Sequence, residues 1–380
     1  MKKALIVANL AGFASFLLND IGILQSMGYE IFYAANANKL KWKDTKRKLE
    51  ERNVKFLQVD FESKNPFSSQ NIKSFRQISK LIKEEKFDLI HCHTPIPGMI
   101  VRLAARRSRK KGTKVIYTTH GFAFTSTIPS LKNKIVFKTI EDFCSRFCDA
   151  IITINQEDYE SAKKMHCKKV YYINGVGVNT QRYANVNIDR STYRKSIGVS
   201  DDEIMVLSVG ELSERKNHQI IIKALSQMDS DKKYVYVVCG NGINGGTGPY
   251  LEKLAKEKGV RLLLLGFRSD IPEITKCSDI GAIPSVREGL GLAGVQSLAA
   301  GIPVVGTSVQ GIKDYVSDGN TGFLCNAFDA DGFSNAIKKL SSMDAKERDR
   351  MKECCVEMAK SFDTKISITQ IKKIYKEVLN

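Results

Sequence analysis

The chain has 380 residues and a formal net charge of +18, with 43% apolar and 26% charged residues. This composition is typical of an ordinary globular protein. One core rarely serves so many residues, so we expect two domains. The nine cysteines are odd in number and never form a Cys-x2-Cys metal pair, which favours free thiols in a reducing cytosol.

The positive charge is concentrated in the first half of the chain. Residues 1–180 contain 31 Lys and Arg against 16 Asp and Glu, a net of +15, and many of these cations fall in two expected helices, 41–52 and 102–114. Such a surface attracts an anionic membrane or a diphosphate-linked substrate, although a merely solvated basic surface is the alternative. We expect no nucleic acid partner, because no helix-turn-helix, zinc-finger or RNA-binding pattern accompanies the charge.

Short apolar runs alternate with amphipathic stretches along the first half. Lys2 and Lys3 precede an apolar run, but Asn9 and Gly12 interrupt it, so we interpret it as a first βα unit and not as a signal peptide. This alternation predicts a parallel sheet with helices on both faces. The expected strands are residues 4–8, 30–34, 55–59, 89–92, 114–118, 150–154 and 169–173, and expected helices include 14–27, 69–85 and 131–148.

The same alternation restarts after a polar stretch at residues 174–202, which predicts a second α/β domain and a hinge near residues 179–190. Past Asp331 we expect helices to the end of the chain. No run of about 18 apolar residues indicates a membrane span. The expected strands of this half are residues 204–209, 234–238, 261–265, 280–284 and 303–306.

The most informative motif is residues 285–305, SVREGLGLAGVQSLAAGIPVV. It predicts a loop with one carboxylate, Glu288, and two glycines, Gly289 and Gly291, followed by a short apolar helix at 292–300. A helix start presents unpaired N–H groups and a positive dipole end, which suit an anion such as a diphosphate. The alternative is that the segment binds no ligand and is an ordinary αβ crossover of a doubly wound sheet, with Glu288 as an acidic residue near a helix start.

Further candidates follow other expected strands, where the βα loops of parallel sheets bind ligands. The first loop holds Gly12 but lacks the Gly-x-Gly-x-x-Gly of dinucleotide-binding proteins. His120 follows the fifth strand, and Lys216 follows the first strand of the second half. His91 and His93 are expected to be packed imidazoles, because no further metal ligand is visible at a suitable spacing.

Taken together, these motifs resemble the retaining, family-four glycosyltransferases with the GT-B fold, of the bacterial capsular and exopolysaccharide type. Glu288 and Gln296 stand where that family has Glu-x7-Glu, so the second acid is an amide here. Residues 210–216 resemble the family's Gly-Arg-Leu-x3-Lys element, with Lys216 at the lysine and Glu211 at the arginine. Arg215 is a candidate substitute for that arginine, and a solvated helix residue is the alternative.

The resemblance implies two Rossmann-like domains, doubly wound around parallel sheets and facing a cleft. An acceptor-binding domain is expected at residues 1–180 and a donor-binding domain at 181–362, with a helix at 363–380 that crosses back to the first domain. Catalytic roles are implied for His120, Lys216 and Glu288. Donor-binding roles are implied for Gly12, Arg215, Gly266, Phe267, Gly289, Leu290, Gly291, Leu292 and Gln296.

The expected activity is retaining transfer of a hexose or N-acetylhexosamine from a nucleotide-diphosphate sugar, UDP first, to a polyprenyl-diphosphate-linked saccharide. Residues 120–134 and 154–159 are similar to segments of such enzymes. We expect a cytoplasmic protein at the inner membrane surface, with no cofactor and no metal. A nucleotide-sugar epimerase of the same fold and a non-enzymatic basic binding protein are the alternatives.

Overall fold

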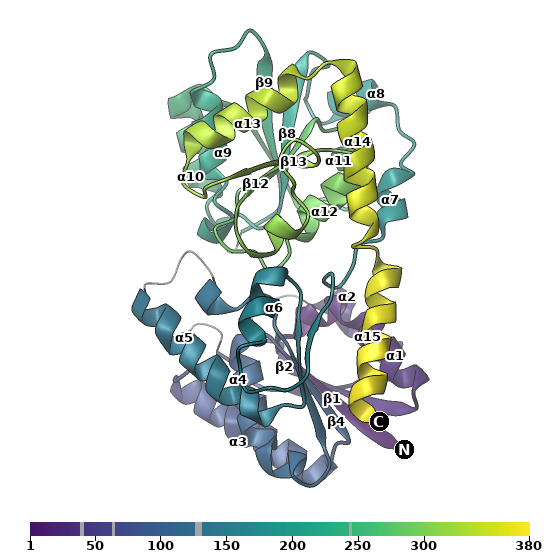
Figure 1. Cartoon of the computed structure of the whole chain (residues 1–380). Coiled ribbons are helices and arrows are strands. Elements are labelled where there is room, and N and C mark those ends of the chain that lie inside the picture. The colour runs from purple at the N-terminus through teal and green to yellow at the C-terminus, as the bar shows by residue number, and fades with distance from the viewer. Residues whose placement is uncertain (39–41, 63–64, 126–130, 243–244) are drawn as a thin grey trace. The chain divides into compact units, whose positions relative to one another are not determined.

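The computed structural model describes residues 1–38, 42–62, 65–125, 131–242 and 245–380 (Figure 1). The described chain forms two compact units. Unit 1 contains residues 1–125, 131–176 and 365–380, and unit 2 contains residues 177–364. The chain therefore passes from unit 1 to unit 2 after Val176 and returns after Thr364.

Unit 1 is built on a seven-stranded sheet of order β3-β2-β1-β4-β5-β6-β7, in which every neighbouring pair is parallel. The order reverses between β1 and β4, and in such sheets ligands bind outside the carboxyl ends of the strands at this point. The strands are β1 (Lys2–Leu10), β2 (Tyr29–Asn36), β3 (Lys55–Gln58), β4 (Leu89–His93), β5 (Lys114–Thr118), β6 (Ala150–Thr153) and β7 (Val170–Tyr172).

Helices cover this sheet, and the last helix of the chain packs in the same unit (Figure 1). A core of buried apolar side chains from β1, β4, β5 and the helices holds the layers together. The helical segments are η1 (Ala11–Phe16), α1 (Leu18–Ser26), α2 (Lys43–Glu50), α3 (Ser69–Glu85), α4 (Pro95–Arg109), η2 (Ala123–Thr125), α5 (Leu131–Cys144), η3 (Ser145–Phe147), α6 (Gln156–Ala162) and α15 (Thr364–Leu379).

Unit 2 repeats the plan with a six-stranded parallel sheet of order β10-β9-β8-β11-β12-β13. Its strands are β8 (Glu203–Val209), β9 (Lys233–Cys239), β10 (Arg261–Gly266), β11 (Ile280–Ile283), β12 (Val304–Thr307) and β13 (Gly322–Cys325). Its helical segments are α7 (Thr180–Ala184), α8 (Arg190–Ser196), η4 (Glu214–Lys216), α9 (Gln219–Ser226), α10 (Gly248–Lys258), α11 (Ile271–Lys276), α12 (Leu292–Ala299), η6 (Gln310–Asp314), α13 (Ala330–Ser342) and α14 (Ala345–Lys360).

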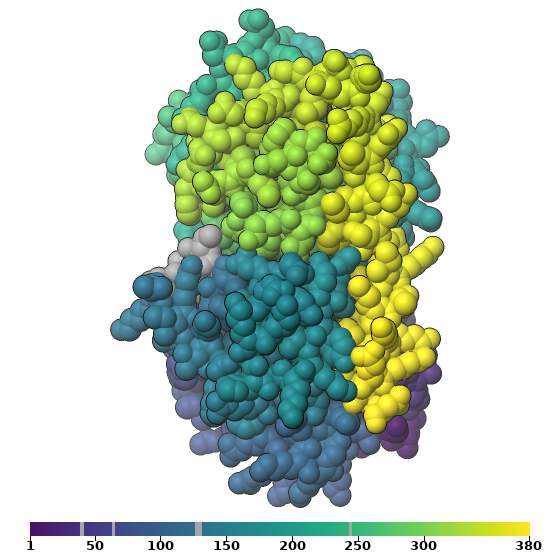
Figure 2. Space-filling model, viewed as in Figure 1, coloured from purple at the N-terminus to yellow at the C-terminus, as the bar shows by residue number. Residues whose placement is uncertain are grey.

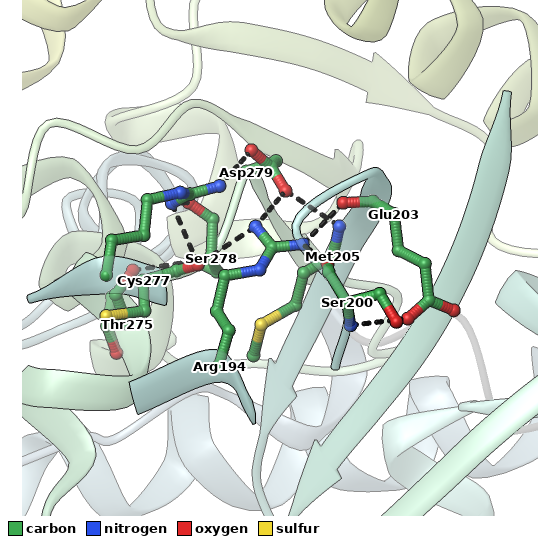
Figure 3. A network of polar contacts seen from close by, with 9 residues as sticks. Arg194, Ser200, Glu203, Met205, Thr275, Cys277, Ser278 and Asp279 are labelled. Carbon is green, nitrogen blue, oxygen red and sulfur yellow. Dashed lines mark hydrogen bonds and ion pairs between the residues drawn. The ribbon is translucent and has the colours of Figure 1, made fainter. Parts of the chain in front are cut away.

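A buried arginine fastens α8 to the amino ends of β8 and β11 (Figure 3). Arg194 is 1% exposed, and its guanidinium donates to the Asp279 carboxylate at 3.1 Å and to the Ser200 carbonyl at 3.0 Å. Asp279 also accepts from the Met205 backbone N–H at 2.8 Å. A buried charge without its partner is costly, so this network fixes where the segment entering unit 2 packs.

The prediction of two α/β units with parallel sheets is confirmed, but several expected boundaries are wrong. The expected helix 14–27 is a 3-10 segment, η1, followed by α1, and the expected helix 102–114 is α4, which begins at Pro95 because proline suits a first helical turn. The expected helix 131–148 ends at Cys144. Strand β13 was missed because it has only four residues, GFLC, after a polar turn.

All nine cysteines are free, and eight of them are buried. The prediction of free thiols is therefore confirmed. Across the parts of the chain that the structure describes, none of the helices combines the length and apolarity that crossing a bilayer requires.

Candidate active site

Unit 2 gathers its predicted charged residues at the carboxyl edge of its sheet. Lys216 ends η4 after β8, and Glu288 lies in the loop between β11 and α12. The Lys216 Nζ donates to Glu288 Oε2 at 2.8 Å, and the Arg215 Nη1 donates to the same oxygen at 3.1 Å. The sequence could not decide whether Arg215 faces solvent or the site, and the structure brings it onto Glu288.

The three charges form a largely enclosed cluster. The side chains of Lys216 and Glu288 are 14% and 15% exposed, whereas that of Arg215 is 39% exposed. Burial alone would raise the pKa of Glu288, but the charges of Lys216 and Arg215 outweigh it and hold that pKa below its usual range. The carboxylate therefore stays ionised and retains two cations beside the start of α12.

Two glycines make room for this cluster. A side chain at Gly210 would lie 3.0 Å from the Lys216 Cε, so the absence of a Cβ lets the lysine lie over the backbone after β8. Gly291 has φ +84 and caps the start of α12, and a Cβ there would come within 2.9 Å of the Glu288 Cγ. Glycine adopts this left-handed conformation without a steric penalty.

Sequence reasoning missed two residues that position the cluster. Asn217 is 3% exposed, has φ 51, and donates from Nδ2 to the carbonyls of Pro284 and Ala327 at 3.2 and 2.7 Å. Gln310 accepts from the Glu288 backbone N–H at 3.1 Å. Asn217 directly follows Lys216, and asparagine tolerates the left-handed region, so its position after a strand-end motif was the available signal.

The remaining predicted donor residues of unit 2 lie on the same carboxyl edge. Gly266 ends β10 with φ 65, and the Phe267 beside it is 81% exposed. Leu290 is buried, Leu292 begins α12, and Gln296 lies one turn further along that helix. A cleft of about 880 Å³ opens beside Arg215 and is lined by residues that include His218, Tyr250 and Phe328.

The predicted residues of unit 1 lie at the carboxyl edge of the other sheet. Gly12 lies in η1 after β1, with open space where a side chain would be. His120 follows β5, and its Nε2 lies 3.2 Å from the Nδ1 of His93 at the end of β4. The rings of Phe13 and His120 pack edge to face, with their centroids 4.9 Å apart.

Burial keeps these imidazoles neutral. It lowers the pKa of His120 to about 4 and that of His91 to about 3, and it also lowers the pKa of His93. His91 is hydrogen-bonded on both ring nitrogens, to the hydroxyl of Tyr375 at 2.8 Å and to that of Thr118 at 2.7 Å. Its expected role as a packed imidazole fits these contacts.

Asp20 of α1 is an unpredicted member of this edge. A carboxylate oxygen of Asp20 and ring nitrogens of His91 and His93 lie within 4.8 Å of one another, and burial raises the pKa of Asp20 to about 7. Three groups of this kind could approach a metal, but both His91 nitrogens are already engaged. Asp20, His93 and His120 instead line a cavity of about 20 Å³, room for one water-sized group.

The two segments of unit 1 that resemble capsular enzymes are joined by one carboxylate. Asp158 of α6 is fully buried and accepts from the Phe122 N–H and the Thr125 hydroxyl, both at 2.9 Å. Burial raises the pKa of Asp158 to about 6. Residues 126–130 of the first segment lie outside the described residues. Asp158 therefore holds the described start of the loop that follows His120.

Each unit thus offers complementary chemistry at its carboxyl edge. Unit 2 presents cations, a carboxylate and a helix start, which can bind a diphosphate and hydroxyl groups. Unit 1 presents neutral imidazoles that can donate or accept single hydrogen bonds. Two Rossmann-like units with such edges are typical of GT-B glycosyltransferases.

The chain belongs to the family-four glycosyltransferases. The profile of glycosyl transferases group 1 matches residues 189–354, and that of glycosyltransferase family 4 matches residues 23–182. EpsD of Bacillus subtilis (strain 168) is 33% identical over 335 residues, which cover 86% of this chain and 84% of EpsD. The UDP-Gal:alpha-D-GlcNAc-diphosphoundecaprenol alpha-1,3-galactosyltransferase of Escherichia coli is 29% identical over 317 residues, 80% of this chain and 79% of that enzyme.

Solved structures share the whole fold at low identity. Anabaena HepE in complex with UDP and glucose matches with a TM-score of 0.79 and 21% identity over 99% of this chain and 100% of that chain. WaaG, a glycosyltransferase involved in lipopolysaccharide biosynthesis, matches with a TM-score of 0.74 and 16% identity over 99% of both chains. At these identities the likeness supports the GT-B fold alone.

Proposed function

We propose that this glycosyltransferase is a retaining hexosyltransferase acting in the synthesis of capsule or another cell-surface glycan. It would move a hexose or N-acetylhexosamine from a UDP-sugar to a polyprenyl-diphosphate-linked saccharide. The observation that carries the proposal is the cluster in which Glu288 accepts from both Lys216 and Arg215 at the start of α12. The name of the Escherichia coli relative, with UDP-Gal as donor and a diphosphoundecaprenol acceptor, supports the same substrate classes.

Departure of a nucleoside diphosphate needs positive charge where negative charge develops. Lys216, Arg215 and the N–H groups of the first turn of α12 supply that charge from fixed positions, which costs little reorganisation during the reaction. Arg215 then replaces the cation that the family pattern has at Glu211. The exposed fraction of Arg215, 39%, is compatible with contact to an entering ligand.

The sugar and the ribose of the donor are held by hydrogen bonds to one anionic and two neutral side chains. Glu288 accepts from sugar hydroxyls, and the Gln296 amide can bond a ribose hydroxyl without bringing charge. His120, as a neutral imidazole, donates a hydrogen bond that orients the sugar against its phosphate. Attack on the face that the diphosphate vacates then retains the anomeric configuration, and the step requires neither metal nor cofactor.

The basic surface of unit 1 suits an enzyme at the cytoplasmic face of the cell membrane. Electrostatic attachment to anionic lipid weakens as salt screens the charges. Flotation with anionic vesicles should therefore fall between 0.1 and 0.5 M NaCl. Equal flotation at both salt concentrations would contradict electrostatic attachment.

A donor screen by thermal shift tests the function, because a ligand that binds the folded state raises its apparent stability. We expect UDP and UDP-sugars to raise the melting temperature more than GDP- or ADP-sugars. Incubation with UDP-sugar and no acceptor gives the second readout. Release of an altered UDP-sugar would indicate an epimerase, and absence of any nucleotide effect would favour a non-enzymatic binding protein.

A further inference from the structure

Helix α5 of unit 1 exposes more large apolar side chains than any other described helix. Leu131 is 76% exposed, Ile135 59%, Val136 40% and Phe143 49%. Single exposed apolar residues are normal on a protein surface. Four of them on one 14-residue helix require a reason.

The helix is turned so that a polar side chain faces inward. Glu141 is 4% exposed, and it accepts from the buried Arg102 at 2.6 Å and from the Tyr117 hydroxyl at 3.1 Å. Breaking a buried ion pair by removing one partner is costly, so this contact fixes the rotation of α5. The usual arrangement of an amphipathic surface helix, apolar inside and polar outside, is thus partly inverted. Figure 2 shows the α5 side of unit 1 at the left margin, open to solvent.

The charge around the apolar side chains is positive. Lys132 and Lys138 are exposed on the same helix and form no ion pair with any described residue. They outnumber the half-exposed Asp142, whose Oδ2 lies 3.3 Å from the His166 Nε2. The neighbouring helix α4, which contacts α5, carries Arg106 and Arg107 at its exposed end. A groove of about 1070 Å³ beside α4 has further cations along its wall, Lys83, Lys86 and Lys111.

We propose that the exposed side of α5 docks on an anionic lipid bilayer. Leu131, Ile135, Val136 and Phe143 enter the boundary between headgroups and acyl chains, while Lys132 and Lys138 reach the lipid phosphates. The cations of α4 add long-range attraction to the anionic bilayer. The proposal deepens the proposed function, since α5 begins eleven residues after His120 and docking brings a lipid-linked acceptor to that edge of unit 1.

Flotation with vesicles of phosphatidylglycerol and phosphatidylcholine, 1:1, tests the docking surface. The Leu131→Ser/Ile135→Ser variant should partition about tenfold less than the wild type, because it loses the apolar groups that enter the bilayer. Lys132→Gln/Lys138→Gln should also lose about tenfold and should bind with less salt dependence. The matched control is Phe328→Ser/Ile366→Ser, which removes exposed apolar side chains elsewhere and should bind within about twofold of the wild type.

Insertion of α5 into the bilayer is measured by the fluorescence of the Ile135→Trp variant. The added indole should emit at shorter wavelength when these vesicles are present. Unchanged emission, or flotation of Leu131→Ser/Ile135→Ser within twofold of the wild type, overturns the proposal. Binding of the wild type to pure phosphatidylcholine as strongly as to the mixture also overturns it. Self-association of the wild type that Leu131→Ser/Ile135→Ser abolishes, without vesicle binding, would assign the surface to a second copy instead.

The docking proposal and the proposed function can be refuted independently of each other. Flotation needs no sugar transfer, so a protein that floats but does not turn over UDP-sugar refutes only the function. Transfer to a water-soluble, short-chain diphosphate-linked saccharide by a protein that does not float refutes only the docking. The serine variant should keep its thermal shift with UDP, since α5 and the Glu288 cluster lie in different units.

Discussion

Units 1 and 2 share one sheet plan, yet the carboxyl edges of their sheets differ in charge. The edge of unit 2 holds an ionised carboxylate between two cations, Lys216 and Arg215. The edge of unit 1 holds His91, His93 and His120, which burial keeps neutral. The net charge of +15 in residues 1–180 lies instead on outer helices such as α4. Under the proposed function, unit 2 would stabilise developing charge and unit 1 would orient the sugar by hydrogen bonds. Variants of the two edges should therefore have different kinetic effects.

The largest effect should come from the Glu288 cluster. Lys216→Ala and Glu288→Ala should each lower kcat about 10²–10³-fold, because the departing diphosphate loses a preorganised charge or the sugar loses its carboxylate. Sugar transfer measured with a saturating donor checks this. Lys233→Ala, which removes an exposed ion pair with Asp202, is the matched control and should leave kcat unchanged. Unchanged turnover in Glu288→Ala would contradict a catalytic role for the Glu288 cluster.

Arg215 is the second cation of the Glu288 cluster. If it binds the diphosphate, Arg215→Ala should raise KM for the donor about tenfold and lower kcat less than Lys216→Ala does. Arg215→Lys should recover part of the lost donor affinity, because the lysine keeps the positive charge but lacks the planar guanidinium that can donate two parallel hydrogen bonds. Equal KM values for the wild type and Arg215→Ala would make Arg215 only a partner of Glu288.

The neutral edge of unit 1 predicts a pH profile without the usual histidine limb. With a pKa of about 4, His120 stays neutral as the pH falls from 8 to 5, so kcat/KM should stay level over that range. The measurement belongs in the Asp20→Asn/Asp158→Asn background, because burial raises the pKa of Asp20 to about 7 and that of Asp158 to about 6, both within this range. An acidic limb near pH 6.5 that disappears in His120→Asn would show that the imidazole works as a cation.

Asp20 should make unit 1 lose stability as the pH rises. Burial raises the pKa of Asp20 from 3.8 to about 7. Between pH 3.8 and 7 the folded state keeps a proton that the unfolded chain has released, so the free energy of unfolding falls as the pH rises through this range. Asp20→Asn should therefore be more stable than the wild type at pH 8, by roughly 1–3 kcal/mol, and equal to it at pH 3.5. Urea denaturation checks this, with Asp231→Asn on an exposed turn as control.

The sequence predicted what local pattern and topology control. Strand and helix periods are readable over a few residues, and parallel strands bring their carboxyl ends to one edge, so Lys216 and Glu288 could be expected together. The glycines at 210 and 291 belong to the same readable loops. What no local pattern shows is the Tyr375 hydroxyl on His91, a contact between residues 284 positions apart.

Asp20 escaped prediction for a different reason. It follows an apolar run and looks like an ordinary acid in the first turn of α1, and only the packing of that helix brings it near His91 and His93. The rotation of α5 was hidden as well, since its sequence does not reveal that Glu141 meets Arg102 inside the protein. Burial and partner choice are products of tertiary packing, which single-sequence patterns do not encode.

The return of α15 to unit 1 has a consequence for synthesis of the chain. The first lobe is assembled from both ends of the polypeptide, with Tyr375 reaching back to His91 and Ile371 and Ile374 buried beside it. On a translating ribosome, the second lobe can therefore close before the first one is finished, even though the first was begun earlier. A nascent chain stalled before residue 365 should carry an incomplete amino-terminal lobe that protease digests faster than its neighbour.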